Sequence, residues 1–448
     1  MKRIKQFLFI ATLFTALFAW AQENTPAQND SAGLGFAMGI SLGVSTFPNS
    51  DGTVESYNSI GLVPDISIGK FGIGFNIELN YRFADSNGNP GFEVRTEDWV
   101  PNSKTNFFEL YLPKIRYIRY GQKGEPIFIK AGTLDGVTLG TGFLVGGYSN
   151  GTFLPDLPVW GLVFDLDGNL FSFPFIGMET FVANLSAFDL FGGRFYIRPL
   201  AITDIPIIKD LQVGTTFAMD RDPYYYLKKN SEYTGPTSAS EPVMIWGADA
   251  IQPILSNTIA KLSAFGDVVI QKDTAGSMLG VGGRLFGFLT YGAQMRFLGK
   301  NFIPSYFDVA YDQYRAAKYA VYTREVSIPA YTGWLASLGF SVLEDKLAFS
   351  ATMDGPIGSS EIKPHLLASF VLGEGILPGF FFDAVYDKTN IDSWDAMAKW
   401  QEDSYMKLNI HYKSGPAVLT LFYNLRYDLT DTGYEPVVSS GTEVSIQF

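Results

Sequence analysis

The chain has 448 residues, of which 47% are hydrophobic, 15% aromatic and only 17% charged, with no cysteine and two histidines. Soluble globular proteins usually carry about a quarter charged residues, so this composition indicates a surface that meets something other than water. The mean hydropathy of +0.09 is too low for a bundle of membrane helices, and the lack of cysteine excludes disulfides and a lipid-modified cysteine anchor.

Residues 1–21 are expected to form a signal peptide, because a basic start and an apolar stretch over 7–18 precede the cleavage signal Ala19-Trp20-Ala21. The apolar stretch is shorter than the ~20 residues that a membrane-spanning helix needs. Cleavage removes three basic residues from a total of 33 Lys+Arg against 45 Asp+Glu, which leaves a net charge of −15. Nucleic acid is therefore excluded as a partner, since phosphate binding requires a basic face.

Residues 22–32 are polar and predict a short disordered lead-in. The next pattern is an alternation that is clearest between Phe71 and Phe83, where every second residue is apolar and the intervening ones are Gly, Asn, Glu or Arg. Successive side chains of a strand point to opposite faces, so this stretch has one apolar face and one polar or small face. The pattern recurs over 292–297, 346–354, 406–413 and 419–428.

The longer alternating runs reach about 9–13 residues, the length that a tilted strand needs to cross hydrocarbon. A soluble β-sandwich also alternates, but its strands usually have about 5–6 residues. It also leaves the aromatic residues near the run ends, such as Tyr81, Phe83, Tyr412 and Tyr427, without a role, whereas aromatic girdles at two membrane interfaces explain them. We therefore predict that residues 33–448 form one all-β domain, a transmembrane antiparallel β-barrel of about 16–20 strands.

The connections between strands show the asymmetry of such barrels. About 20 candidate strands are centred near residues 40, 62, 77, 113, 130, 162, 178, 196, 214, 247, 264, 281, 294, 333, 350, 367, 382, 408, 422 and 444. If the first strand begins in the periplasm, odd-to-even junctions are extracellular and hold the four longest polar connections, near 84–105, 220–241, 300–323 and 387–403. The tight turns at 344–346 and 414–415 fall on even-to-odd junctions, as periplasmic turns should.

The stretch 132–151 contains seven glycines but no nucleotide-binding motif, because Val145 and Tyr148 occupy the positions where a glycine and a lysine are required. We favour the interpretation that these glycines let a strand bend, bulge or pass close to a neighbour. The alternative is a loop folded into the pore as a constriction.

Two of the long connections have local helical spacing. Over 305–320, Phe307, Tyr311, Tyr314 and Lys318 recur at helical intervals, and Ser393 is placed to cap a turn within 392–402. These loops either pack their aromatic residues on the barrel rim, or 300–323 folds inward and narrows the pore.

No enzymatic or metal site is predicted. Neither His365 nor His411 is followed two residues later by a nucleophilic serine, and two histidines without H-E-x-x-H spacing do not form a zinc site. His411 alternates with apolar residues and is expected to point into the lumen. We expect no cofactor.

Charges on the polar faces are expected to face the lumen, because they would be costly in lipid and could set ion selectivity inside a pore. The candidates are Glu78, Arg82, Arg116, Arg194, Arg198, Arg284, Arg296, Lys407 and Arg426. Arg194 and Arg198 share a face with Tyr196 and predict a basic ladder, and the alternative is a structural mesh of salt bridges in which acids neutralise these cations.

The last eight residues alternate Val444, Ile446 and Phe448 with polar residues and end on the aromatic Phe448. In this the chain resembles the outer-membrane β-barrel superfamily, whose members typically end in an amphipathic strand with a C-terminal aromatic residue. The resemblance implies that the barrel-assembly machinery recognises Val444, Ile446 and Phe448. It also implies the outer membrane of a diderm bacterium as the location, with lipid as a partner.

A barrel of this size without a plug domain predicts a porin-like channel for passive diffusion of small hydrophilic solutes. One alternative is a transporter of hydrophobic ligands resembling the fatty-acid family, whose N-terminal hatch the short segment 22–32 does not supply. The other alternative is a structural or adhesive surface barrel. The sequence leaves the solute, the ion preference and the oligomeric state open.

Overall fold

The structure is a computed structural model. It describes residues 34–446 with gaps at 49–53, 85–89, 102–106, 154–156, 158, 204, 206, 230–232, 234, 359–360, 400–403 and 431–432. The predicted signal peptide over 1–21, the lead-in over 22–32 and the terminal Phe448 lie outside the described residues.

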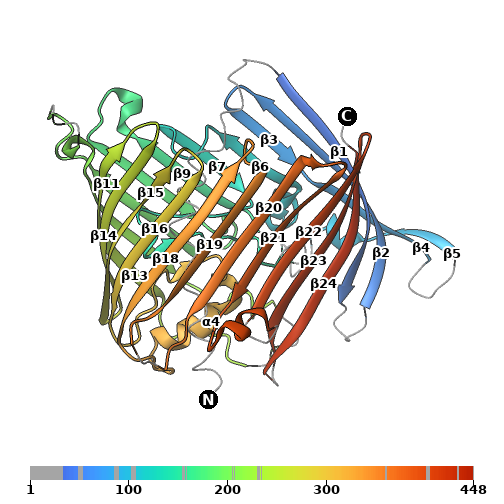
Figure 1. Cartoon of the computed structure of the whole chain (residues 1–448). Coiled ribbons are helices and arrows are strands. Elements are labelled where there is room, and N and C mark those ends of the chain that lie inside the picture. Colours follow the sequence, from blue (N-terminus) through green and yellow to red (C-terminus); the bar gives the residue numbers. More distant parts are fainter. Residues whose placement is uncertain are drawn as a thin grey trace.

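Most of the described chain is extended and belongs to one large sheet (Figure 1). Its strands are β1 (Leu34–Pro48), β2 (Val54–Ile68), β3 (Phe71–Phe75), β4 (Ile77–Ala84), β5 (Pro90–Val94), β6 (Ile115–Tyr120), β7 (Ile127–Gly132), β9 (Gly161–Asp167), β10 (Ile176–Val182), β11 (Leu190–Ile197), β12 (Gln212–Asp220), β13 (Val243–Ser256), β14 (Ala260–Gln271), β15 (Thr274–Leu285), β16 (Leu289–Leu298), β18 (Tyr331–Val342), β19 (Leu347–Pro356), β20 (His365–Leu377), β21 (Phe380–Lys388), β22 (Ser404–Ser414), β23 (Ala417–Thr430) and β24 (Gly433–Ile446).

The strands pair in chain order, each antiparallel to the next. β3 and β4 both pair with β2 and together fill one position in the sheet. β6 pairs with β3 and β5 pairs with β4, so these two strands share the next position. The 22 described strands therefore fill 20 positions. β1 also pairs with β24, where Ser41 lies opposite Ser445 and Leu42 opposite Val444. The order of paired neighbours therefore returns to its start. The predicted antiparallel β-barrel is confirmed, at the upper end of the predicted strand number.

One predicted strand was placed too early in the chain. The fourth strand was centred near residue 113, but residues 107–114 form α3 (Phe107–Tyr111) and η3 (Leu112–Lys114), and β6 begins only at Ile115. Pro113 within η3 removes a backbone donor that a strand would use, and it fits the first turn of a short helix instead.

Long and short connections segregate to opposite ends of the sheet, as predicted. Three of the four predicted long connections, over 221–242, 299–330 and 389–403, lie at one end, here called the long-loop end. The fourth, predicted over 84–105, is interrupted by the strand β5. The turns over 69–70, 343–346 and 415–416 lie at the other, here called the short-turn end. In Figure 1 the helix α4 (Tyr311–Tyr322) marks the long-loop end.

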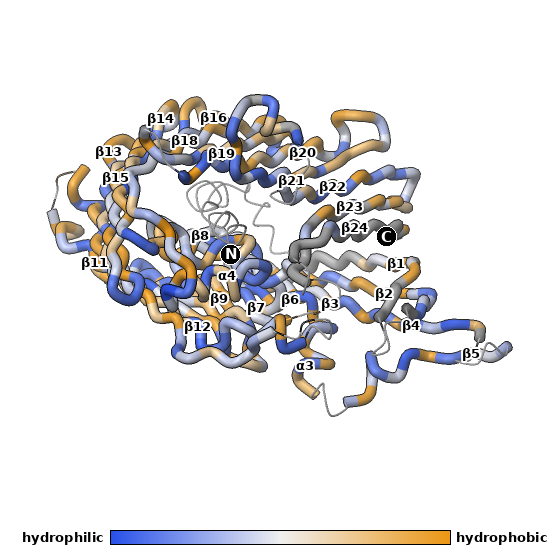
Figure 2. Tube along the Cα trace, turned by 90° about the horizontal axis from the view of Figure 1, so that it is seen from below, coloured by the Kyte–Doolittle hydropathy of each residue, from blue (hydrophilic) through white to orange (hydrophobic). Residues whose placement is uncertain are grey.

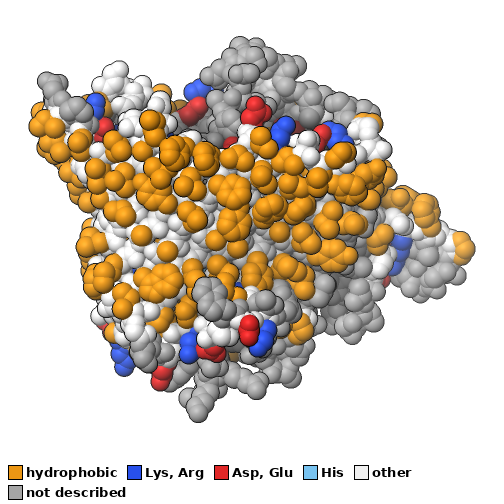
Figure 3. Space-filling view, viewed as in Figure 1, with side chains coloured by type: hydrophobic (Ala, Val, Ile, Leu, Met, Phe, Trp, Pro, Cys, Tyr) orange, Lys and Arg blue, Asp and Glu red, His pale blue; other side chains and the backbone are white. Residues whose placement is uncertain are grey.

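The outer face of the sheet is apolar. On β13, Met244 and Trp246 are exposed whereas Val243 and Ile245 are buried on the inner face, because alternate side chains leave a strand on opposite sides. Figure 3 shows this outer face as a broad hydrophobic belt with charged side chains gathered at its two rims. A hydrophobic belt between two charged rims is the surface of a barrel that sits in a bilayer.

The remaining described elements are short. They are η2 (Thr96–Asp98), η4 (Gly168–Phe171), η5 (Ile208–Asp210), η6 (Trp394–Ala398) and the strands β8 (Val145–Gly146) and β17 (Phe307–Asp308). The predicted cap on the turn in 392–402 is confirmed, since the amide of Ala396 donates to Ser393 Oγ at 3.3 Å at the start of η6. No helix within the described ranges is long and apolar enough to cross a membrane.

Candidate functional site

Two connections from the long-loop end fold into the barrel. Figure 2, seen along the strands, places α4 and β8 inside the ring of strands. The glycine-rich segment 133–151 and the segment 299–330, here called the two inner segments, are mostly buried. They join through a parallel pair of β8 with β17, and the amide of Ser305 donates to the Phe143 carbonyl at 2.8 Å.

The favoured interpretation of 132–151 as glycine that bends a strand was therefore wrong, and the inward loop is what forms. The stretch has no alternation that could separate a lipid face from a lumen face, so it cannot join the wall. The second segment folds inward too, which is the alternative under which 300–323 narrows the pore. Its helix begins at Tyr311, later than the predicted 305, because Phe307 and Asp308 form the strand β17.

An apolar cluster fixes the inner segments to one side of the wall. Phe143 stacks on Phe302 with ring centroids 5.5 Å apart, and Phe302 lies against Gly276 of β15. A Cβ atom at Gly276 would come within 2.4 Å of the Phe302 ring, so only glycine lets the segment approach the wall this closely. In the described part of the chain, the wall strands whose buried side chains join this cluster are β7 and β9 to β16, and Tyr331 of β18 packs against it.

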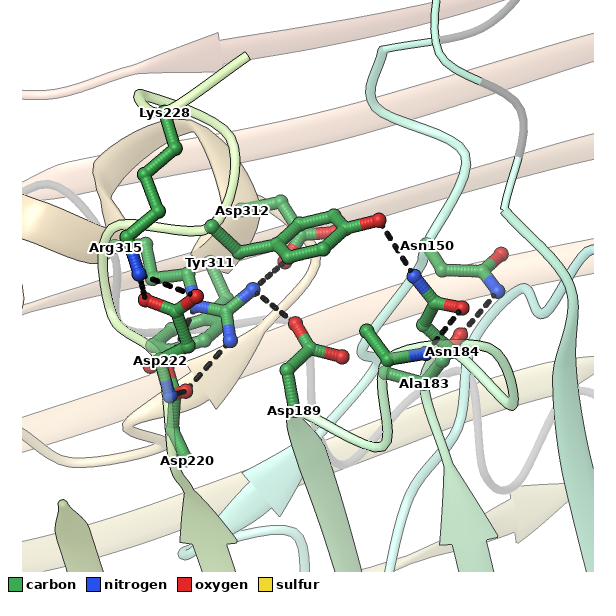
Figure 4. Close-up of polar contacts among 12 residues, drawn as sticks. Asn150, Ala183, Asn184, Asp189, Asp220, Asp222, Lys228, Tyr311, Asp312 and Arg315 are labelled. Carbon is green, nitrogen blue, oxygen red and sulfur yellow. Dashed lines mark hydrogen bonds and ion pairs between the residues drawn. The ribbon is translucent and has the colours of Figure 1, made fainter. Parts of the chain in front are cut away.

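Helix α4 is held by buried charges (Figure 4). Arg315 donates to both carboxylate oxygens of Asp220 on β12, at 2.6 Å each, and its Nη1 lies 2.8 Å from Asp189. Tyr311 Oη also donates to Asp220, at 2.5 Å. Tyr148 of the glycine-rich segment donates to Asp312 at 3.1 Å, so the same helix binds both the wall and the other inner segment.

A second buried pair lies within the inner segment itself. Lys318 Nζ donates to Asp308 Oδ2 at 2.8 Å and to the Tyr306 carbonyl at 2.7 Å. Burial raises the pKa of Asp308 to about 7 and lowers the pKa of Lys318 to about 8, because both side chains are removed from water. The hydrogen bonds between them oppose both shifts and keep the pair together.

The glycine-rich segment contacts the wall at Gly140 and Thr141. The amide of Gly140 donates to Glu179 of β10 at 2.9 Å, and Thr141 Oγ1 donates to Asp267 of β14 at 2.5 Å. Gly140 has a φ of +56°, a left-handed conformation that favours glycine, and a Cβ there would lie 2.7 Å from Arg194 Nε.

The predicted basic ladder exists as a row of side chains, but acids neutralise it. Arg194 and Arg198 lie on either side of the Tyr196 ring, with guanidinium carbons 4.7 and 5.1 Å from its centroid. Arg194 donates to Asp249 at 2.8 and 2.6 Å, and Arg198 to Asp167 at 2.5 Å. This part of the wall therefore forms the predicted alternative, a structural mesh of salt bridges.

Other candidates are paired as well. Arg82 contacts Glu55 at 3.2 Å and Glu93 at 2.9 Å, and Arg116 contacts Asp65 at 2.6 Å.

Arg296 is buried and donates to the neutral Gln294 Oε1 on its own strand, at 2.9 and 2.7 Å. Arg284 lies half-buried on β15, and its Nε has no hydrogen-bond acceptor among the described residues. Lys407 is exposed on β22, and Glu78 is half-buried on β4. The side chain of Arg426 and those of Ile446 and Phe448 lie outside the described residues, whereas Val444 is half-buried on β24. The roles of these candidates in selectivity and in barrel assembly stay predictions.

The two histidines contact polar groups of the inner face. His365 of β20 lies between two carboxylates, with Nδ1 3.2 Å from Asp354 and Nε2 3.1 Å from Asp387. His411 of β22 lies 2.9 Å from Thr420 Oγ1 and stacks on Phe381. Both ring nitrogens of His365 are thus engaged by acids rather than by a serine, and this contact set provides no nucleophile.

Sequence reasoning missed several charges of the inner face. Asp249 alternates with the exposed Ala248 and Ala250, and this pattern was available in the sequence. Arg119 of β6 and Lys130 of β7 were also missed. Arg119 is three residues from Arg116, so strict alternation puts the two arginines on opposite faces.

No protein-family model matches the chain, and no curated protein sequence matches it. Solved structures with related folds include CdiB from Acinetobacter baumannii, with 8% identity over 92% of this chain and 60% of that one and a TM-score of 0.27. Acinetobacter baumannii OccAB3 has 11% identity, with 93% and 99% of the two chains covered and a TM-score of 0.35. Pseudomonas aeruginosa OccK3 (OpdO) has 10% identity, with 93% and 95% covered and a TM-score of 0.36. This chain thus spans less than two thirds of the CdiB chain.

Proposed function

We propose that this chain is a porin-like outer-membrane channel in which small hydrophilic solutes diffuse passively past the two inner segments. The apolar belt places the barrel in a bilayer, and a barrel of this strand number is wide enough to hold water unless it is filled. The proposal therefore depends on how completely the inner segments fill it.

The filling is uneven, and this observation carries the proposal. Among the described residues, the buried cluster around the inner segments involves wall strands β7 and β9 to β16. The opposite wall contacts α4 where Gln313 Nε2 donates to the Tyr427 carbonyl at 3.0 Å, and it has buried polar residues such as Lys388. Other polar side chains of its inner face remain open to solvent. The side chain of Arg116 is 45% exposed and that of Asp383 is 41% exposed. The solute path would therefore run along this polar wall, where fewer side chains are buried, and α4 would narrow it.

The filter would act by width and by charge, without bond chemistry. Rings and ladders of charged side chains set ion selectivity in pores of this kind. Here the charges that hold the inner segments are buried and paired with one another, as in Arg315 with Asp220. The exposed groups of the open wall are therefore the ones that a passing solute meets.

Single-channel recording in planar bilayers tests the proposal, using the mature chain (22–448) and a variant that lacks residues 305–318. The intact protein is expected to give stable conductance steps, and the deletion is expected to raise the step size because it removes most of α4. Both proteins should show the same heat-modifiable migration of a folded barrel. Absence of steps from a folded intact protein, or an unchanged step size in the folded deletion variant, would contradict the proposal.

A further inference from the structure

Two cations face each other on the inner wall near the short-turn end. Arg119 of β6 and Lys130 of β7 are direct partners in the antiparallel register. Directly opposed side chains have Cβ atoms about 4.5–5.5 Å apart, and like charges at such positions repel each other. Arg119 is two residues from the β6–β7 turn, where the amide of Gly121 donates to the Lys70 carbonyl of the β2–β3 turn at 3.0 Å. The pair therefore lies beside the mouth at that end.

A break in strand register adds a third cation. Gly74 of β3 pairs with Tyr117, but the next residue, Phe75, pairs with Ile115, so Arg116 is an extra residue on β6. Such a bulge changes the side on which the following side chains emerge. A Cβ at the buried Gly74 would lie 2.7 Å from the Tyr117 ring and 3.2 Å from Arg116 Nε, so both side chains lie on the inner face.

These three residues, Arg116, Arg119 and Lys130, are here called the basic cluster. The bulge thus brings together residues that strict alternation would separate. The outer face of the same strand carries Ile118 and Tyr120, and Tyr120 is 42% exposed in the hydrophobic belt.

The basic cluster has more positive charge than its acids balance. Within the described ranges, its one ion pair joins Arg116 to Asp65 at 2.6 Å, and Asp65 also accepts from Tyr117 at 2.8 Å. Neither Arg119 nor Lys130 has an ion pair or a side-chain hydrogen bond there, and Arg119 Nε is a buried donor with no acceptor. Asp135 attracts Lys130 electrostatically, but the two form no ion pair or hydrogen bond within the described ranges.

Several other cations of the barrel interior have acids, although Arg296 contacts only the neutral Gln294. Arg194, Arg198 and Arg315 each contact a carboxylate at 2.5–2.8 Å. Lys123, in the turn beside the basic cluster, contacts Asp165 at 2.7 Å. A pair of opposed cations without a counterion costs folding free energy unless an anion from solution joins it.

A glycine of the neighbouring strand lies beside Arg119. Gly72 of β3 lies next to Arg119, where a Cβ would meet Arg119 Nη2 and Tyr117 Oη at 3.6 Å each. Arg119 and Lys130 are both half-buried, so the two side chains are only partly removed from solvent. A guanidinium presents paired donors that match the oxygens of a carboxylate or a phosphate, and the ammonium supplies a point charge.

We propose that the basic cluster is an oxyanion-binding site at the short-turn mouth, which selects small carboxylate or phosphate solutes for passage. The proposal deepens the channel function and rests on it. Arg119 and Lys130 bind the oxyanion directly. Arg116 is paired with Asp65, so it contributes positive electrostatic potential to the site rather than a free hydrogen-bond donor.

Ion selectivity tests the site in the conducting protein. The reversal potential across a KCl gradient is measured for the wild type, Arg119→Gln, Lys130→Gln and the double variant. The double variant is expected to shift toward cation preference and each single variant to shift by less, because chloride loses its attraction to the mouth. Lys70→Gln is the matched control, since it removes one positive charge at the same end from a lysine already paired with Glu125 at 3.0 Å. No shift in the double variant, or an equal shift in Lys70→Gln, overturns the proposal.

A binding measurement separates this site from the channel function. Line broadening of inorganic phosphate in 31P spectra is recorded with the detergent-solubilised protein, and succinate competes in a second titration. The double variant is expected to bind phosphate roughly tenfold more weakly or worse, because charge-assisted contacts are lost. If the wild type binds phosphate but does not conduct, the proposed binding site stands and the proposed channel function is rejected. If the wild type conducts and the double variant binds phosphate as tightly as the wild type, the binding site is rejected and the channel function stands.

The folded state of the variants gives an independent readout. Removing a like-charge repulsion should leave the thermal midpoint of the double variant equal to or above that of the wild type in phosphate-free buffer. Phosphate should raise the midpoint of the wild type and not that of the double variant, because a ligand stabilises only the state that binds it. An equal rise in both proteins counts against the basic cluster.

Discussion

Arg315 of α4 and Asp220 of β12 form a bidentate ion pair, with Nε 2.6 Å from Oδ2 and Nη2 2.6 Å from Oδ1. The two residues are 95 positions apart in the chain and both are buried. Asp189 lies 2.8 Å from the same guanidinium. The pair therefore attaches α4 to the wall.

Replacing Arg315 with leucine should release α4 from the wall. Asp220 and Asp189 would then be buried without a cation, and such uncompensated charge typically costs about 3–5 kcal/mol. We expect a lower free energy of unfolding in urea and larger, noisier conductance steps. Lys228→Leu is the control, because its pair with Asp222 is exposed and contributes little. Equal stability of the Arg315 and Lys228 variants would show that the buried pair does not hold the helix.

An arginine on the outer belt should destabilise the barrel in a depth-dependent way. Leu279 is in the middle of β15 and is 65% exposed on the outer face. Leu279→Arg should lower the free energy of folding into lipid vesicles by about 2–4 kcal/mol. Ile259→Arg makes a similar change at a turn of the short-turn end, where Ile259 is 62% exposed, and should cost much less. Equal costs at the two sites would argue against lipid contact at mid-barrel.

The pairing of the first and last strands can be tested with cysteines, because the chain has none of its own. Ser41 and Ser445 are direct partners, so Ser41→Cys with Ser445→Cys should form a disulfide under mild oxidation. Ser439 is six residues further along β24, a distance of about 20 Å at the rise of a strand, and Ser41→Cys with Ser439→Cys should not cross-link. Non-reducing gel migration and mass spectrometry report both results. Cross-linking of the second pair alone would mean a different register.

Export should remove residues 1–21. Intact mass and N-terminal peptide analysis of the membrane-extracted protein should place the first residue at Gln22. Ala21→Phe should block processing and leave the longer chain, because cleavage sites of this kind require small residues at the preceding positions. A wild-type protein that retains residues 1–21 in the membrane would contradict the signal-peptide prediction.

The strand layout could be predicted from sequence to within a few residues. Alternation between Phe71 and Phe83 identified an inner and an outer face, and Phe71 is 38% exposed on the outer face while Gly72 is buried on the inner face. The one displaced strand, β6, begins after a short helix that the Ile115–Tyr120 sequence does not reveal. The alternating pattern does not mark the residue at which a connection ends. The ends of the strands were therefore harder to predict than the faces on which their side chains lie.

Much less of the candidate site was predictable. Arg194 and Arg296 were correctly placed on polar faces, but the sequence could not tell that Asp249 neutralises the first and that the second contacts the neutral Gln294. Partners of inward side chains come from strands or loops far away in the chain, and period-two patterns carry no information about them. The glycine-rich segment was misinterpreted for the same reason, since its inward path depends on contacts with β10 and β14.

The sequence by itself determined that this protein is a barrel with a hydrophobic exterior, because the period of two is a local property of each strand and lipid demands it in every strand. Only the tertiary structure decided what occupies the interior. It brought Arg315 to Asp220, and the bulge beside Gly74 put Arg116 on the same face as Arg119 and Lys130. Such contacts depend on register and on chain closure over long distances, and these are set by the whole sheet rather than by any stretch of residues within it.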